Sequence, residues 1–146
     1  MTAPTTPQGF RWLLDQFADE TRGVTHVLVA SGDGLQLVTG RTVPRDLGDR
    51  LAPLVASLLS TADAASSLLQ LGRSDHLTVR HPLGWLLVMR VDERTGVLVV
   101  AGPDCDLRVV AGNMTRFFSG IGHTLTPELR HELHNATIRA SATGHA

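Results

Sequence analysis

Three residues near the start of the chain have the types that hydrolases use for nucleophilic catalysis. Ser31 and Asp33 lie in the turn Ser31-Gly32-Asp33-Gly34-Leu35, and His26 precedes them. A catalytic serine needs a histidine base that an acid orients, and α/β-hydrolases place the serine on a sharp turn between a strand and a helix. This turn instead joins two apolar segments, where Ser, Gly and Asp are ordinary turn residues. We therefore expect a structural turn and a protein that is not an enzyme.

Histidines in the C-terminal part of the chain raise a second chemistry, metal binding. His131 and His134 could share one face of a helix, and His123 lies upstream. Zinc sites usually combine histidines with thiols or with converging carboxylates. The single cysteine, Cys105, is far away along the chain and has no second thiol with which to form an internal disulfide. We expect no metal site and no cofactor.

Arginines that border the longest predicted helix suggest a third kind of chemistry, contact with a phosphoryl group. Arg45, Arg50 and Arg73 lie near its two ends. An arginine can stabilise the charge that develops on a transferred phosphoryl group, as activators of GTPases do. Charged residues at helix ends are more often simply solvated, which is the plainer interpretation. These three residues are therefore candidates for charged contacts with a partner and nothing more specific.

Composition excludes several classes of function. All 13 basic residues are arginine, and without lysine the chain cannot form a P-loop, a protein kinase site or a pyridoxal phosphate site. The net charge is −1, with acidic and basic residues mixed along the chain, which disfavours nucleic acid as a partner. No apolar run approaches the roughly 20 residues needed to cross a bilayer. We expect a cytoplasmic protein without membrane insertion.

Hydrophobic periodicity predicts one globular domain of alternating helices and strands. The segment from Val27 to Ala30 is apolar on both faces, so its hairpin should lie inside a sheet that helices cover on both sides. Pro53 should either kink the long helix or delay its true start to about Ala52. The predicted elements are a helix from Phe10 to Ala18, a hairpin over 25–39, a helix from Leu47 to Gln70, strands at 76–80, 84–91 and 96–101, and a helix over 104–120.

The two ends of the chain are predicted to be less ordered than the domain between them. Residues 1–8 are polar and contain prolines, which predicts a flexible N-terminus before a domain over 9–122. Residues 123–146 are predicted to form a tail with one short helix that starts at Thr126-Pro127-Glu128. Disorder is expected from Ala140 onward.

The element order, helix, two strands, helix, three strands and helix, resembles the roadblock/light-chain family, and several short motifs resemble its bacterial members encoded in conservon operons. The resemblance implies an α+β fold: a profilin-like three-layer α/β/α sandwich around a five-stranded antiparallel sheet. It also implies a homodimer that binds or modulates a small Ras-like GTPase, beside a sensor-kinase-like protein. The motifs are Phe10-Arg11-Trp12-Leu13-Leu14, Thr21-Arg22-Gly23-Val24, Ser31-Gly32-Asp33-Gly34-Leu35, Pro44-Arg45-Asp46, Ala101-Gly102-Pro103-Asp104-Cys105-Asp106 and Leu125-Thr126-Pro127-Glu128-Leu129.

The long helix is apolar over more of its circumference than packing on one sheet requires. A second cover is therefore expected, and a twofold contact with another copy of the chain is the commonest way to supply it. The sequence does not decide which stripe faces the sheet. The candidate interface residues, for a dimer or for a GTPase, are Leu51, Leu54, Leu58, Ala62, Ala65 and Leu69.

Three functional hypotheses follow, and the least favoured is a hydrolytic enzyme that uses Ser31 and Asp33. The favoured one is a non-catalytic homodimeric interaction module that regulates or scaffolds a small Ras-like GTPase in a bacterial signalling complex. The alternative is a small-molecule-sensing domain of profilin-like layout, with a ligand held between sheet and helix. His76 and Trp85 are the residues that could line such a pocket.

Overall fold

The computed structural model describes residues 4–144, and the predicted order of helices and strands is confirmed, with the helix expected in the C-terminal tail longer than predicted. The elements are α1 (Pro7–Glu20), β1 (Val24–Ser31), β2 (Gln36–Thr39), α2 (Arg45–Leu69), β3 (His76–His81), β4 (Gly84–Asp92), β5 (Thr95–Ala101), α3 (Leu107–Phe118), a 3-10 turn (Gly122–Thr124) and α4 (Pro127–Gly144).

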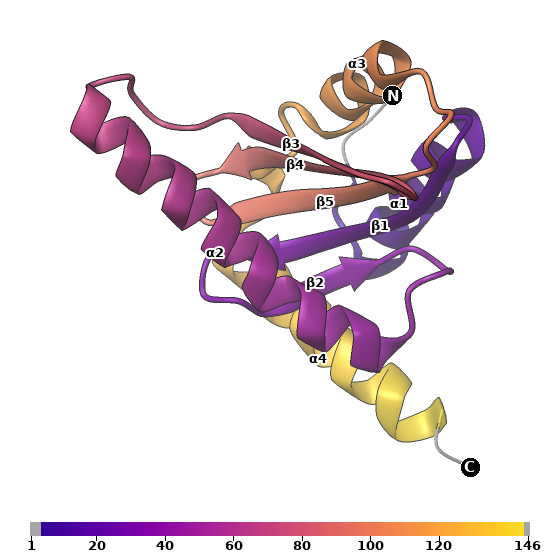
Figure 1. Ribbon diagram of the computed structural model, residues 1–146. Coiled ribbons are helices and arrows are strands. Elements are labelled where there is room, and N and C mark those ends of the chain that lie inside the picture. The colour runs from indigo at the N-terminus through magenta and orange to yellow at the C-terminus, as the bar shows by residue number, and fades with distance from the viewer. Residues whose placement is uncertain (1–3, 145–146) are drawn as a thin grey trace.

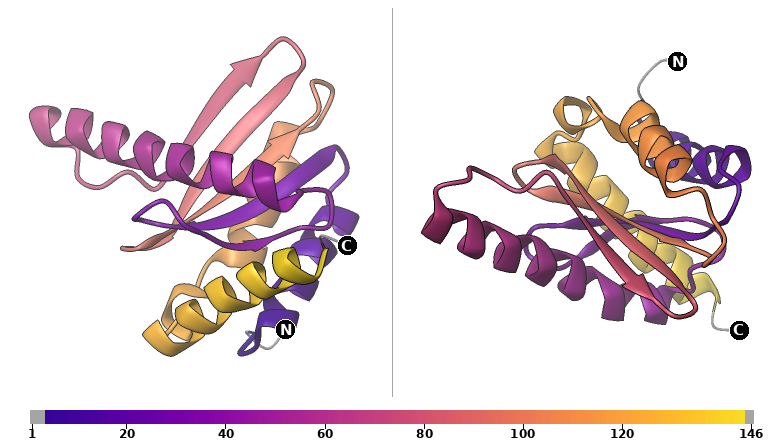
Figure 2. Two further views of the ribbon diagram at one scale, coloured as in Figure 1. Left: turned by 90° about the horizontal axis from the view of Figure 1, so that it is seen from below. Right: turned by 45° about the horizontal axis from the view of Figure 1, so that its top comes forward.

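The five strands form one antiparallel sheet in the order β2-β1-β5-β4-β3. Helix α2 crosses one face of this sheet, and α1, α3 and α4 lie on the other face (Figures 1 and 2). The predicted three-layer α/β/α sandwich is therefore confirmed. Strand β1 lies between β2 and β5, as its doubly apolar sequence requires, but β2 is an edge strand, so only half of the first hairpin lies inside the sheet.

Alternate residues of β1 feed two separate hydrophobic cores. Val27 and Val29 point into the larger core under α1, α3 and α4, whereas Leu28 and Ala30 point into a smaller core under α2. The larger core contains the ring of Phe17, whose centroid is 5.6 Å from that of Phe117. Burial on both faces explains why this strand does not alternate between apolar and polar residues.

The turn after β1 has a structural role, as the sequence favours. Gly34 has φ +86°, a left-handed conformation that glycine adopts without strain. The hydroxyl of Ser31 donates to the carboxylate of Asp33 and accepts the backbone N–H of Leu35 at 3.1 Å. A Cβ on Gly34 would lie 3.3 Å from Cα of Pro53, so the turn also sets how closely α2 passes.

Helix α2 runs without interruption through Pro53, which is exposed. It begins at Arg45, so the expected delayed start near Ala52 is wrong. Proline removes one backbone donor and pushes against the carbonyl of the preceding turn. Pro53 borders the turn at Gly34 and is still exposed, so it lies at the surface of the helix and not in its contact with the sheet.

Both ends of the chain are more regular than the sequence suggests. Helix α1 starts at Pro7, inside the segment expected to be flexible, and the side chain of Thr6 caps it by accepting the N–H of Gly9 at 3.0 Å. Helix α4 is 18 residues long and its backbone stays helical past Ala140, where disorder was expected. It is held because Leu129 and Leu133 are buried in the larger core. Residues 145–146 lie outside the described residues.

Gly84 tests the spacing between β4 and β5. A Cβ there would lie 2.7 Å from the carbonyl oxygen of Ala101, which is backbone and cannot turn away. We expect Gly84→Ala to lower the free energy of unfolding by about 1–3 kcal/mol. The control is Gly112→Ala in α3, where no atom lies within 4 Å. It should raise stability by about 0.5–1 kcal/mol, since alanine favours a helix. Urea unfolding measures both, and equal effects would contradict this account.

Candidate interaction surface on helix α2

One side of α2 packs on the sheet and is identified by its burial. It carries small and branched residues, which let the helix approach closely: Gly48, Ala52, Val55, Leu59 and Ser66 are buried. Gly48 is needed because the side chain of Gln36 fills the space of its Cβ. The amide of Gln36 donates to the carbonyl of Arg45 at 3.0 Å and so joins β2 to the first turn of the helix.

The predicted interface residues divide between two environments. Leu54, Ala65 and Leu69 are exposed, with Leu54 56% and Leu69 66% accessible. Leu51 and Leu58 are half-buried against the smaller core. Ala62 is also half-buried. The predicted stripe therefore straddles the border between the sheet contact and the outer side of the helix, which Leu68, 87% exposed, extends.

The outer side of α2 carries no charge over most of its length. Between Arg50 and Asp63 the sequence has no ionisable residue, and none follows Asp63 until Arg73. Asp63 itself points inward and pairs with Arg90 of β4 at 2.5 Å. Leu54, Leu68 and the neighbouring small residues thus form a continuous uncharged surface. Large uncharged, apolar surfaces are uncommon on monomeric proteins and often mark sites where another protein binds.

The sheet beside α2 offers a second apolar strip on the same side of the molecule. Leu77, Leu86 and Val100 border the smaller core but are only half-buried. Val79 of β3 pairs with Leu86 and so shares its face. Because α2 crosses the sheet diagonally (Figure 1), it leaves this corner of the sheet uncovered.

The two edges of the sheet differ. Helix α4 lies along β2, and the hydroxyl of Thr137 donates to the outward carbonyl of Leu37 at 3.2 Å. Strand β3 pairs with β4 on one side, and among residues 4–144 nothing pairs with its other side. An open edge presents backbone donors and acceptors to any partner strand, whereas a covered edge does not. The alternation of polar and apolar residues in β3 is typical of such an edge strand.

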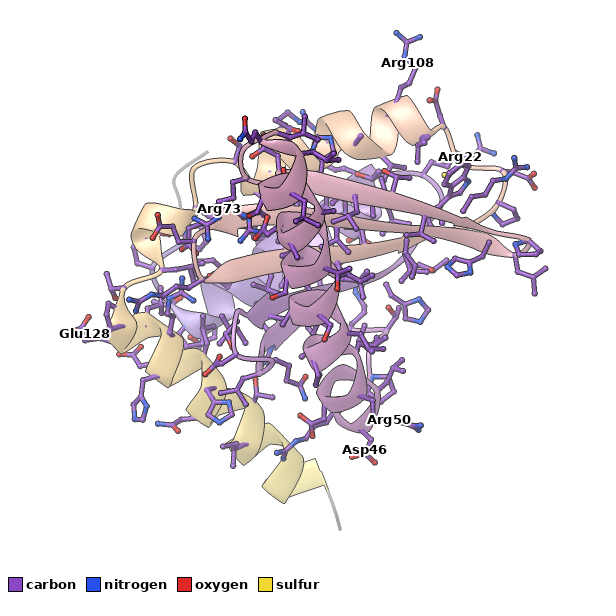
Figure 3. The ribbon with its side chains drawn as sticks, turned by 60° about the vertical axis from the view of Figure 1, so that its left-hand side comes forward. Arg22, Asp46, Arg50, Arg73, Arg108 and Glu128 are labelled. Carbon is purple, nitrogen blue, oxygen red and sulfur yellow. The ribbon has the colours of Figure 1, made fainter. Side chains whose placement is uncertain are left out.

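The three candidate arginines do not come together. Arg45 and Arg50 lie on the first turns of α2, and Arg73 follows its last turn. From Arg45 to Leu69 the helix is about 36 Å long at 1.5 Å per residue. Figure 3 shows Arg50 and Arg73 at opposite ends of α2. Arg45 pairs with Asp49 at 3.4 Å and Arg73 pairs with Glu93 at 3.4 Å. They therefore cannot act as one site within a single chain.

A polar staple that the sequence did not reveal fixes the C-terminal half of α2. Asp63 accepts the side chain of Arg90 and, at 3.0 Å, the backbone N–H of Ser74. The bond from Ser74, with Arg90 adding to it against the opposing effect of burial, holds the pKa of the Asp63 carboxyl below its usual value. The staple ties the helix, the loop after it and β4 together, so it positions the uncharged surface.

The possible hydrolytic residues also have structural explanations. Ser31 and Asp33 line a pocket of about 650 Å³ together with His131 and His134 of α4. The serine hydroxyl is engaged within its own turn, as described above. His26, five residues up the strand, lies about 16 Å from Ser31 at 3.3 Å per residue. Within residues 4–144, no three His, Cys, Asp or Glu side chains are grouped so as to hold a metal ion.

Among the described residues, α2 is also the one helix that is long and apolar enough to cross a membrane by length and composition. Only 22% of its most apolar 18-residue window is buried within the chain. A core helix with a second packing partner has the same composition, and this helix already packs on the sheet.

Residues 10–101 match the family described as Roadblock/LC7 domain. The chain belongs to this family. The matched range begins within α1 and ends with β5, so it contains the whole sheet and α2. Helices α3 and α4 follow the matched range and lie on the face of the sheet opposite α2.

Solved structures share the fold. A Roadblock/LC7 domain from Streptomyces avermitilis is 22% identical over 82% of this chain and 96% of that chain, with a TM-score of 0.71. Myxococcus xanthus MglB is 13% identical over 91% of this chain and 96% of that chain, with a TM-score of 0.72. Acanthamoeba castellanii profilin IA is 15% identical over 73% and 91%, with a TM-score of 0.52, which agrees with a profilin-like layout. No curated protein sequence matches this chain.

The staple gives a prediction about pH. Because the pKa of Asp63 is lowered on folding, its ionised form adds stability that is present above the value of the unfolded chain, near 3.8, and lost as pH falls through the lower folded value. Asp63→Asn should therefore be less stable than the parent at neutral pH, and the difference in stability between the two proteins should shrink below pH 4. Hydrogen exchange should locate the loosening at residues 70–75. If the thermal stability of Asp63→Asn depended on pH in the same way as that of the parent, this role of Asp63 would be contradicted.

Proposed function

We propose that this chain is a non-catalytic, cytoplasmic, homodimeric interaction module that binds and regulates a small Ras-like GTPase in a bacterial signalling complex. The observation that carries the proposal is the uncharged outer side of α2, which nothing among residues 4–144 covers. Family membership supports the proposal, because the roadblock resemblance implies a dimeric platform for such a GTPase. The same resemblance adds a sensor-kinase-like protein to the proposed complex.

The proposed dimer is supported by where the uncovered apolar groups lie. Leu58 of α2 and Leu86 and Val100 of the sheet are half-buried at the border of the smaller core, and β3 is the open edge of the same sheet. A twofold axis beside β3 would pair this strand with its copy and lay the second α2 over the uncovered corner of the sheet. Such an isologous contact uses the same patch twice and closes at two chains.

The covered edge at β2 supports a closed dimer over a longer assembly. If both edges were open, one copy could add to each side and the sheet would extend without limit. With α4 along β2, pairing through β3 uses up the one open edge that the described residues offer.

GTPase binding is proposed to use charge at the ends of α2 that the dimer leaves free. Arg50 is exposed and extends into solvent beside Asp46 (Figure 3), whereas Arg45 and Arg73 already pair with carboxylates. Regulation without a supplied catalytic arginine is expected to act by ordering residues of the GTPase itself. This assignment places the module among regulators and not among enzymes.

A charge on the outer side of α2 tests the dimer. Leu54→Glu should convert a dimer into a monomer, because burying an unpaired carboxylate at the centre of an apolar contact weakens association by at least about 10-fold. The matched control is Leu35→Glu, a leucine 43% exposed on the turn before β2. Its mass should stay that of a dimer. Light scattering after gel filtration at tens of micromolar measures both, and a monomeric parent protein would refute the dimer.

Binding to a Ras-like GTPase from the same genome tests the partner. The parent protein should bind the GTPase with an affinity that differs between the GDP-bound state and a state loaded with a non-hydrolysable GTP analogue. Arg50→Glu should weaken binding by about 10-fold or more, as expected for loss of a charged contact. Arg108→Glu, an exposed arginine on α3, is the control that should not.

The readout is biolayer interferometry, with GTP hydrolysis and nucleotide exchange measured in parallel. Absence of binding in both nucleotide states by a protein that is still dimeric would reject the GTPase as partner and leave the dimer standing.

A further inference from the structure

An open groove lies on the face of the sheet opposite the proposed dimer contact. It runs between α3 and the outer strands β3 and β4 and has a volume of about 210 Å³. Its floor is apolar, since Leu87 and Met89 of β4 belong to the larger core. Leu107, Ala111 and Met114 of α3 form its wall.

The groove exists because α3 covers β4 but does not reach over β3. His76 pairs with Met89 and Thr78 pairs with Leu87, so these β3 residues stand on the same face as the groove floor. Both are exposed. The groove is therefore closed by the sheet below and α3 on one side, and it opens toward β3. Methionines in its lining let it adapt to the shape of an occupant.

The lining of the groove holds one cationic residue and no carboxylate. Arg108 is the cation, and His76, which follows Asp75 in the chain, adds an imidazole ring. Arg80 follows on the same face of β3, with its guanidinium 5.7 Å from the centre of the Trp85 ring. Figure 3 shows Arg108 pointing outward from α3, so on the strand side Arg80 is the cationic group and His76 offers a ring nitrogen for hydrogen bonding. The carboxylate of Asp106, the residue before α3, caps that helix by accepting the backbone N–H groups of Arg108 and Val109.

We infer that this groove binds a small apolar carboxylate, a molecule of one or two rings or a short alkyl chain that carries a single negative charge. The apolar part lies against Leu87, Met89 and Met114, and the carboxylate faces His76 at the open rim. The size fits, because an apolar cavity of about 150 Å³ holds benzene and this one is somewhat larger. Ligand sites are typically apolar with a few polar groups that set orientation.

This site is independent of the proposed GTPase function. The groove faces away from α2 and opens beside β3 on the side of α3, so neither the outer side of α2 nor the Arg50 end of that helix contributes to it. It gives a definite place to the sensing role that the sequence offers as an alternative, and it does so with His76, one of the two residues named for it.

Binding of 2-naphthoate, a fluorescent two-ring carboxylate, tests the inference. The parent protein should bind it saturably at one site per chain in isothermal titration calorimetry. Ala111→Phe should weaken binding at least 10-fold, because the added ring occupies the groove from an exposed position of α3. The matched control is Val109→Phe, which adds a ring to the same helix outside the groove, where Val109 is 48% exposed. Its affinity should stay within a factor of two.

The charge assignment is tested with the neutral analogue 2-naphthamide. The parent protein should prefer the carboxylate to the amide, and His76→Gln should remove most of that preference while leaving the affinity for the amide unchanged. Unfolding curves confirm that each variant is folded. No saturable binding by the parent protein at millimolar ligand, or equal binding by Ala111→Phe, would overturn the site. Equal preference in His76→Gln would overturn its specificity for carboxylates.

Discussion

The contact between α2 and the sheet is the constraint on which the rest of the structure depends. A 25-residue helix lies diagonally on a five-stranded sheet, and only its narrow row of small and branched residues can approach closely. Gly48 has no side chain where Gln36 packs against α2, and Gly34 has none where Pro53 lies close to the turn. The staple from Asp63 to Arg90 then holds the far half of the helix in the same direction. Because the helix is straight and the sheet is wide, one corner of the sheet and one side of the helix stay uncovered together.

Much of this fold is readable from local chemistry. The glycines around Asp33 predict a tight turn, and the doubly apolar Val27–Ala30 predicts a strand covered on both faces; both are found. Helix α4 was underestimated because its polar residues suggested a solvated tail. The signal was present in Leu125, Leu129 and Leu133, which recur every four residues and are buried. Periodicity shows that a segment is amphipathic, but its length depends on what it packs against.

The candidate site was less readable, for a physical reason. On α2, leucine and alanine occur on both the sheet side and the outer side, so hydrophobicity cannot separate the two. Leu59 and Leu54 are chemically identical in sequence, yet one is buried and the other is 56% exposed. The charges were equally ambiguous, because arginines such as Arg45, Arg50 and Arg73 are common near the ends of any helix. Their separation along α2, and the pairing of two of them, appear only when the helix is seen as one rigid element.

The two faces of the sheet divide the molecule into regions with different chemistry. On the α2 face the uncovered surface is broad and uncharged over much of its length, which suits contact with another protein. On the α3 face the uncovered surface is a narrow apolar groove beside cationic side chains. Strand β3 borders both: Leu77 and Val79 face α2, and His76 and Thr78 face the groove. The open edge proposed to meet a second copy of the chain and the groove on the α3 face therefore belong to one short strand.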